Sequence, residues 1–117
     1  MTNSLSPQLD RLLEAAKAGL DEAAGGGAVC AFTKAGTPVP GIKYHEGRWA
    51  ALNEVARRYR GDSKDPATAA LEISDAWSAD LERLTRRDAG PDWIAYRHGG
   101  LDALADLLSA ANPTTGS

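Results

Sequence analysis

Four segments of the chain carry apolar residues at intervals of three and four positions, which is the period of one face of an α-helix. Glycine and proline separate these segments, and both residues mark helix ends. Ser6-Pro7 and Asp65-Pro66 each place a capping residue directly before a proline, and Gly25-Gly26-Gly27 ends the first segment. The pattern predicts helices over residues 7–24, 46–60 and 66–87, and a fourth helical segment from Pro91 to Ala111.

The apolar faces of these segments predict the core. Residues 46–60 present one stripe, formed by Trp49, Leu52, Val55, Ala56 and Tyr59. In the fourth segment the apolar side comprises Trp93, Ile94, Leu101, Leu104, Leu107 or Leu108, and Ala111. Gly99-Gly100 interrupts it, and each glycine costs about 1 kcal/mol relative to alanine in a helix. The pair either divides the segment into two helices or lets an aromatic ring pack on the backbone, and we favour a bend with close packing.

Residues 25–45 are rich in glycine and proline and interrupt the helical pattern. The stretch 28–34, AVCAFTK, is apolar and β-leaning, so that a small β-hairpin with 38–44 as its returning strand is one reading. Pro38 and Pro40 lack amide donors, which favours instead an extended or polyproline-like course. A long irregular stretch in a compact domain is ordered by packing or carries function.

Length and composition bound the fold class. The chain has 117 residues, 43% of them hydrophobic and 25% charged, which is typical of a globular protein with one core. We therefore expect an all-α fold: one compact four-helix bundle-like domain over residues 1–112, with a Gly/Pro-rich excursion between its first two helices and a frayed tail at 113–117.

The sequence also carries indications of cellular location. No apolar run approaches the 18 or so residues that cross a bilayer, and the N-terminus lacks the basic and apolar regions of a secretory signal. Cys30 is the single cysteine, so no intramolecular disulfide can form. These features predict a cytoplasmic protein.

The residue patterns that carry catalytic or metal chemistry are incomplete. His45-Glu46 begins like the zinc-protease pattern H-E-x-x-H, but Trp49 occupies the position of the second histidine. Asp102 and Asp106 lie one turn apart, as metal ligands do, yet a solvated helix face has the same spacing. Cys30 in an apolar stretch is typical of a small buried residue. We expect no catalytic residue, no metal and no cofactor.

Aromatic and basic residues gather in the second quarter of the chain. Residues 43–64 hold six basic and three acidic residues within an otherwise acidic protein of net charge −3. Because interfaces are enriched in Trp, Tyr and Arg, the preferred hypothesis is a non-catalytic helical module that binds another protein or itself, most simply as a homo-oligomer. Its predicted binding residues are Lys43, Tyr44, His45, Arg48, Trp49, Arg57, Arg58 and Arg60.

Two alternative functions stay open at this point. The basic strip 43–64 could contact nucleic-acid phosphates as part of a regulator, although whole-domain binders usually have a pI above about 9. A small enzyme or ligand carrier is the other alternative, because pockets are mainly apolar with few polar groups. Its pocket would lie between the helices and the 25–45 excursion and would be lined by Phe32, Tyr44, His45, Trp49, Tyr96 and His98.

Overall fold

The structure is a computed structural model, and it describes three stretches of the chain: residues 5–24, 40–62 and 65–110. These stretches form four α-helices: α1 (Leu5–Ala24), α3 (Pro40–Asp62), α4 (Pro66–Arg86) and α5 (Pro91–Ala110). The prediction of an all-α fold is confirmed for this part of the chain, which contains no strand. None of the described helices has an apolar stretch long enough to cross a membrane.

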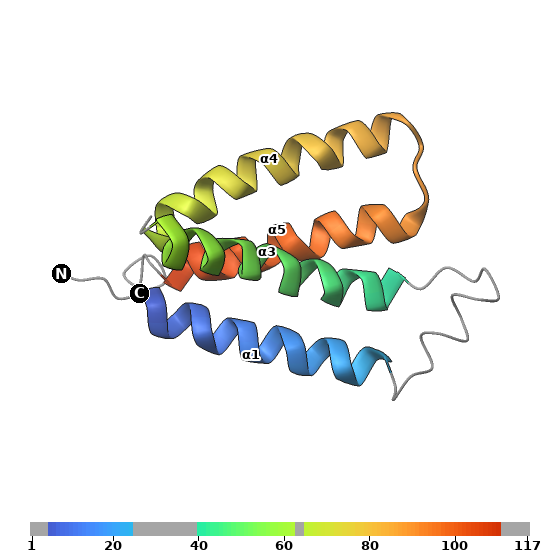
Figure 1. The fold of residues 1–117 in the computed structure, drawn as a ribbon. Helices are drawn as coiled ribbons and strands as arrows, with labels where there is room; N and C mark the ends of the chain where they lie inside the picture. Colours follow the sequence, from blue (N-terminus) through green and yellow to red (C-terminus); the bar gives the residue numbers. More distant parts are fainter. Residues whose placement is uncertain (1–4, 25–39, 63–64, 111–117) are drawn as a thin grey trace.

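The helices alternate in direction, so that α3 and α5 run parallel to each other and antiparallel to α1 and α4 (Figure 1). The most extensive contact in the fold joins the two parallel helices, α3 and α5. Helices α1 and α4 lie on opposite sides of this pair and scarcely touch each other. The cross-section of the bundle is therefore a flattened rhombus whose short diagonal is the α3–α5 contact.

Two glycines allow this short diagonal. Gly47 of α3 faces the backbone carbonyl of Tyr96 in α5, and Gly99 of α5 faces the backbone carbonyl of Tyr44 in α3. A Cβ atom on either glycine would overlap the opposite carbonyl oxygen, so the helices can approach this closely only because both positions lack a side chain. The residue that follows, Gly100, packs in the same way against the indole ring of Trp77.

The core fills the space on both sides of the α3–α5 contact. Its centre is built from small and branched side chains, as close helix packing requires. The buried cluster comprises Leu9, Ala16, Ala51, Leu52, Val55, Ala56, Ala69, Ala70, Ile73, Trp77, Ala103, Leu104 and Leu107. Three members of the stripe predicted for residues 46–60, namely Leu52, Val55 and Ala56, belong to this core, as do Leu104 and Leu107 of the last segment.

The structure corrects the predicted start of the second helix. Helix α3 begins at Pro40, six residues before the predicted position, so the extended or strand course predicted for residues 38–44 is wrong for residues 40–44. The physical reason is that the first turn of a helix leaves its amides unpaired, which suits a proline. The remainder of the predicted hairpin lies outside the described residues.

The other helix boundaries differ less from the prediction. Helix α1 begins at Leu5, so Ser6 lies inside the first turn instead of before it. Asp65 is the predicted N-cap of α4, and its carboxylate accepts a hydrogen bond from the Thr68 amide at 3.2 Å. Helix α5 continues through Gly99-Gly100 as one element, and the predicted packing of an aromatic ring on this backbone is confirmed by Trp77.

Candidate functional site

An open hollow of about 480 Å³ lies where the first turns of α3 and α5 meet the end of α1. We call it the aromatic hollow, and it is lined by Leu20, Lys43, Glu46, Trp49, Ala50, Trp93, Tyr96 and Arg97. Three of these residues, Lys43, Trp49 and Tyr96, are among the binding or pocket residues predicted from the sequence. The lining thus combines three aromatic rings with three charged side chains.

Helix geometry places these side chains together. Lys43, Glu46 and Ala50 follow one another at intervals of three and four, so they share one face of α3. Trp93 and Tyr96 stand three residues apart on α5 and share a face in the same way. Because Gly47 holds α3 against the Tyr96 carbonyl, these two faces open side by side toward Leu20 of α1.

Tyr96 holds the other aromatic rings of α4 and α5 in place around the aromatic hollow. Its ring stacks on Trp77 of α4, with centroids 5.3 Å apart and planes 19° from parallel. Trp93 meets the same ring edge to face at 6.1 Å. Aromatic pairs in these two arrangements are each stabilising beyond the area that they bury. Through Trp77, the ring of Tyr96 is therefore packed against the buried core.

Both cations of the hollow are held over aromatic rings. The Lys43 ammonium lies 5.4 Å from the centre of the Trp93 ring and 2.9 Å from a carboxylate oxygen of Glu46. The Arg97 guanidinium lies 4.5 Å from the centre of the Trp77 ring and 3.4 Å from Asp80. Each cation thus combines a cation–π contact with an ion pair that solvent partly reaches, and such pairs contribute only about 0–1 kcal/mol.

The tryptophans of the hollow are open to solvent. Trp49 is 37% exposed and Trp93 is 55% exposed, whereas Trp77 is 6% exposed. The sequence pattern placed Trp93 on the apolar, core-facing side of its segment, and this prediction is wrong. Trp93 lies in the first turn of α5, where the helix has not yet reached the core.

A second constellation of predicted residues serves the contact between α3 and α5. The Tyr44 hydroxyl donates to Asp102 at 2.5 Å, and the Arg48 guanidinium donates to Asp106 at 2.7 Å. The two donors lie one turn apart on α3, and the two acceptors lie one turn apart on α5. We call these two side-chain pairs, which join the parallel helices, the clasp. The carboxylates of Asp102 and Asp106 are accordingly engaged by protein donors.

The clasp perturbs both of its donors. Donation to the Asp102 carboxylate, together with burial, raises the pKa of the Tyr44 phenol above its ordinary value. Burial alone would lower the pKa of the Arg48 guanidinium, but hydrogen bonds to Asp106 and Tyr44 outweigh it and raise that pKa. Both groups are therefore held in their protonated forms, which is what a structural hydrogen bond requires.

Acidic neighbours pair with most of the predicted basic strip. Besides Lys43 and Arg48, which are paired as described above, Arg58 contacts Glu54 at 3.1 Å and Glu72 at 3.3 Å. Arg60 contacts Asp10 of α1 at 3.3 Å. Arg57 is exposed. Lys64 lies outside the described residues.

The predicted pocket residues do not all line the aromatic hollow. The ring of His45 packs against Gly19 of α1, and His98 is exposed on α5. Within the described residues no ring contact or hydrogen bond joins these two histidines. Phe32 lies outside the described residues. Among the lining residues, sequence reasoning missed five as members of a site, because only the packing of α1, α3 and α5 brings them together: Leu20, Glu46, Ala50, Trp93 and Arg97.

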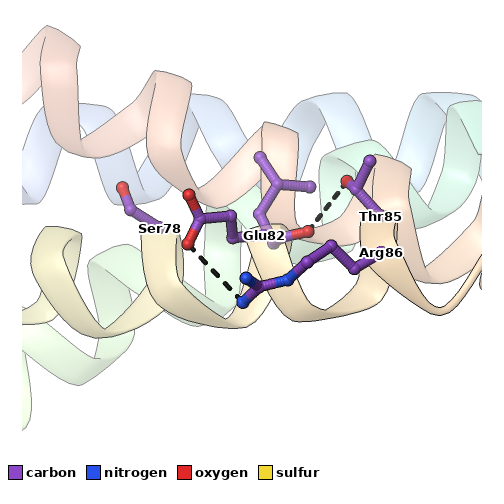
Figure 2. A pocket seen from close by; sticks show the side chains of 5 residues that line it. Ser78, Glu82, Thr85 and Arg86 are labelled. Carbon is purple, nitrogen blue, oxygen red and sulfur yellow. Dashed lines mark hydrogen bonds and ion pairs between the residues drawn. The ribbon is translucent and has the colours of Figure 1, made fainter.

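Another depression, of about 310 Å³, lies over α4 (Figure 2). All five residues that line it come from this one helix: Ser78, Leu81, Glu82, Thr85 and Arg86. The Thr85 hydroxyl donates to the Leu81 carbonyl at 2.8 Å, and Arg86 approaches Glu82 at 3.7 Å. Because no second element closes the depression, it is a shallow part of the helix surface.

Neither a metal-ligand cluster in the described residues nor a match to known proteins adds to the assignment of function. In the described ranges 5–24, 40–62 and 65–110, no three side chains from His, Cys, Asp and Glu are grouped as metal ligands would be. In comparisons with protein families, with curated proteins and with solved structures, the chain has no significant match. The geometry of the aromatic hollow is therefore the basis on which function is inferred.

Proposed function

We propose that the protein is a non-catalytic helical interaction module that binds another polypeptide through the aromatic hollow. The observation that carries the proposal is the exposure of Trp49 and Trp93 around a hollow in which Tyr96 stacks on the buried Trp77. Exposed tryptophan is costly to keep in water, and interfaces concentrate it at their centres. The module would take an apolar side chain of its partner between these two rings.

The charges around the hollow suggest the chemistry of the partner. Its lining contains two cations, Lys43 and Arg97, and one carboxylate, Glu46. Lys43 can leave Glu46 for another carboxylate at a small cost in free energy, because the ion pair between them is solvent-accessible. An apolar anchor flanked by carboxylates therefore fits the hollow better than one flanked by cations.

The pairing of the basic strip favours this function over nucleic-acid binding. A phosphate that approached Arg48 would have to displace Asp106, which contacts the guanidinium at 2.7 Å. One that approached Arg58 would have to displace both Glu54 and Glu72. Nucleic-acid binding draws most of its affinity from cations that are free to neutralise phosphates. We accordingly expect a labelled DNA duplex not to bind at low salt, and binding with a steep salt dependence would favour the nucleic-acid alternative.

The test uses a short fluorescein-labelled peptide with two leucines one helical turn apart, flanked by glutamates, which we call the acidic leucine peptide. Fluorescence anisotropy should show that it binds the full chain, and that the same peptide with lysines in place of the glutamates binds more weakly. The Trp93→Ser variant should lose at least about tenfold in affinity, as expected for a central interface aromatic. Equal binding by wild type and Trp93→Ser, or no binding at all, would contradict the proposal.

The matched control is Leu71→Ser. Leu71 is an exposed apolar residue of α4, and it does not line the hollow. At protein concentrations where the wild type is monomeric, this variant should bind the acidic leucine peptide as wild type does. Circular dichroism of both variants should show unchanged helix content, since both side chains are largely exposed.

A further inference from the structure

We infer that a second copy of this chain is an occupant of the aromatic hollow, with Leu71 of α4 as the inserted side chain. This inference rests on the proposed function of the hollow and names its partner. Three large apolar side chains of the described residues are exposed: Trp49, Trp93 and Leu71. Two of them line the hollow, and the third projects from another helix.

Leu71 has the form of an anchor for such a hollow. It is 55% exposed, and it lies in the second turn of α4, on the side turned away from the buried residues Ala70 and Ile73. A single exposed leucine is common on protein surfaces, so exposure alone carries no weight. Leu71 differs from such a residue in having a carboxylate nearby, because the exposed Asp75 follows one turn later on the same face of α4.

The charges of the two surfaces are complementary. Asp75 lies beside the anchor, and Lys43 lies in the hollow, over the ring of Trp93. Seating Leu71 against Trp93 brings the carboxylate of one copy toward the ammonium of the other. Lys43 is available for this contact because its pair with Glu46 is solvent-accessible.

The two surfaces lie at different places on the bundle. Leu71 is near the start of α4, and the hollow is formed by the starts of α3 and α5, which run in the opposite direction (Figure 1). Anchor and hollow therefore lie toward opposite ends of the bundle. Two copies that exchanged both contacts would form a closed dimer, whereas contacts made with different neighbours would produce a head-to-tail chain.

Sedimentation velocity over a range of protein concentrations tests this inference. Wild type should show a sedimentation coefficient that increases with concentration, and Leu71→Ser and Trp93→Ser should each weaken association at least about tenfold. An equimolar mixture of the two variants should associate again, but only into a 1:1 pair, because one variant supplies the hollow and the other supplies the anchor. Association of wild type that Leu71→Ser leaves unchanged would overturn the inference.

Charge reversal provides a second arm that does not depend on removing apolar area. Lys43→Glu should weaken self-association, and adding Asp75→Lys to the same chain should restore it. The inference would also be overturned if the wild-type chain stayed monomeric up to about millimolar concentration. At that concentration, only association weaker than about 4 kcal/mol escapes detection. If that monomer still bound the acidic leucine peptide through Trp93, the proposed function would stand and only the second copy as partner would fail.

Discussion

Gly47 of α3 lies directly against the backbone carbonyl of Tyr96 in α5, and no side chain separates the two helices at this point. The reciprocal contact of Gly99 with the Tyr44 carbonyl fixes the same crossing from the other helix. This approach places Trp93, Tyr96 and Arg97 beside the first turns of α3. The aromatic hollow is thus a consequence of where the two glycines stand.

Replacing Gly47 with alanine should destabilise the fold. Alanine is the better helix former by about 1 kcal/mol, but its Cβ would overlap backbone atoms, which cannot move aside as a flexible side chain does. Overpacking of this kind costs about 1–3 kcal/mol, and its upper end applies where backbone atoms collide, so we expect a net loss of about 1–2 kcal/mol in urea unfolding.

The control for this substitution is Gly61→Ala. Gly61 lies in the last turn of the same helix with nothing within 4 Å of an added Cβ. Its replacement should be neutral or should gain up to about 1 kcal/mol from helix propensity. A Gly47→Ala variant as stable as Gly61→Ala would contradict the close approach of α3 and α5.

The Tyr44–Asp102 hydrogen bond predicts an alkaline dependence of stability. Because the native state holds the pKa of Tyr44 above its ordinary value of 10.0, the protonated phenol stabilises the fold. This contribution is fully present below about pH 10 and is lost as the pH rises through the native pKa. The free energy of unfolding of wild type relative to Tyr44→Phe should therefore decline above pH 10.

Spectroscopy separates this titration from general alkaline unfolding. The difference in absorbance at 295 nm between wild type and Tyr44→Phe reports the ionisation of Tyr44. Its midpoint should lie above 10 in the native protein and should return toward 10 in urea. Asp102→Asn should lower the native midpoint, and a midpoint that this variant leaves unchanged would contradict the assigned cause.

The turn between α4 and α5 offers a stabilising substitution. Asp88 has φ of 56°, in the left-handed region, and its amide donates to the Thr85 carbonyl while the Ala89 amide donates to the Leu84 carbonyl. This is the Schellman arrangement, in which glycine is the preferred residue. Asp88→Gly should raise the free energy of unfolding by about 1 kcal/mol.

A substitution to glycine in the middle of α4 provides the comparison. Ser78→Gly on the exposed side of α4 should lose about 0.5 kcal/mol, because the residue has helical dihedrals there. Opposite signs for the two substitutions in urea unfolding would support the left-handed conformation of Asp88. A loss of stability in Asp88→Gly would speak against it.

The sequence was informative where a local signal decides the structure. Asp65-Pro66 gave the start of α4, because capping depends only on neighbouring residues. The predicted start of α3 was wrong at Pro40, because a proline suits both an extended chain and the first turn of a helix. The burial of Ile42, two residues after Pro40, favours the helix, and no local pattern reports that packing.

The candidate site was predictable only in part. Trp49 and Lys43 were identified from the local concentration of aromatic and basic residues. Trp93 was assigned to the core, because periodicity gives the face of a helix without telling how far along it the core extends. Gly47 carried no signal in its own segment, since the close approach involves Tyr96, which is 49 positions away.

The most direct test of the aromatic hollow as a docking surface is NMR of the three indole N–H groups in the presence of the acidic leucine peptide. Trp77 serves as the internal reference, because the residue is buried and its indole N–H donates to Glu54 Oε1 at 3.4 Å. Single Trp→Phe variants assign the signals. We predict that the Trp49 and Trp93 signals shift progressively with added peptide while the Trp77 signal moves much less. Unchanged Trp49 and Trp93 signals at saturating peptide would contradict binding in the hollow.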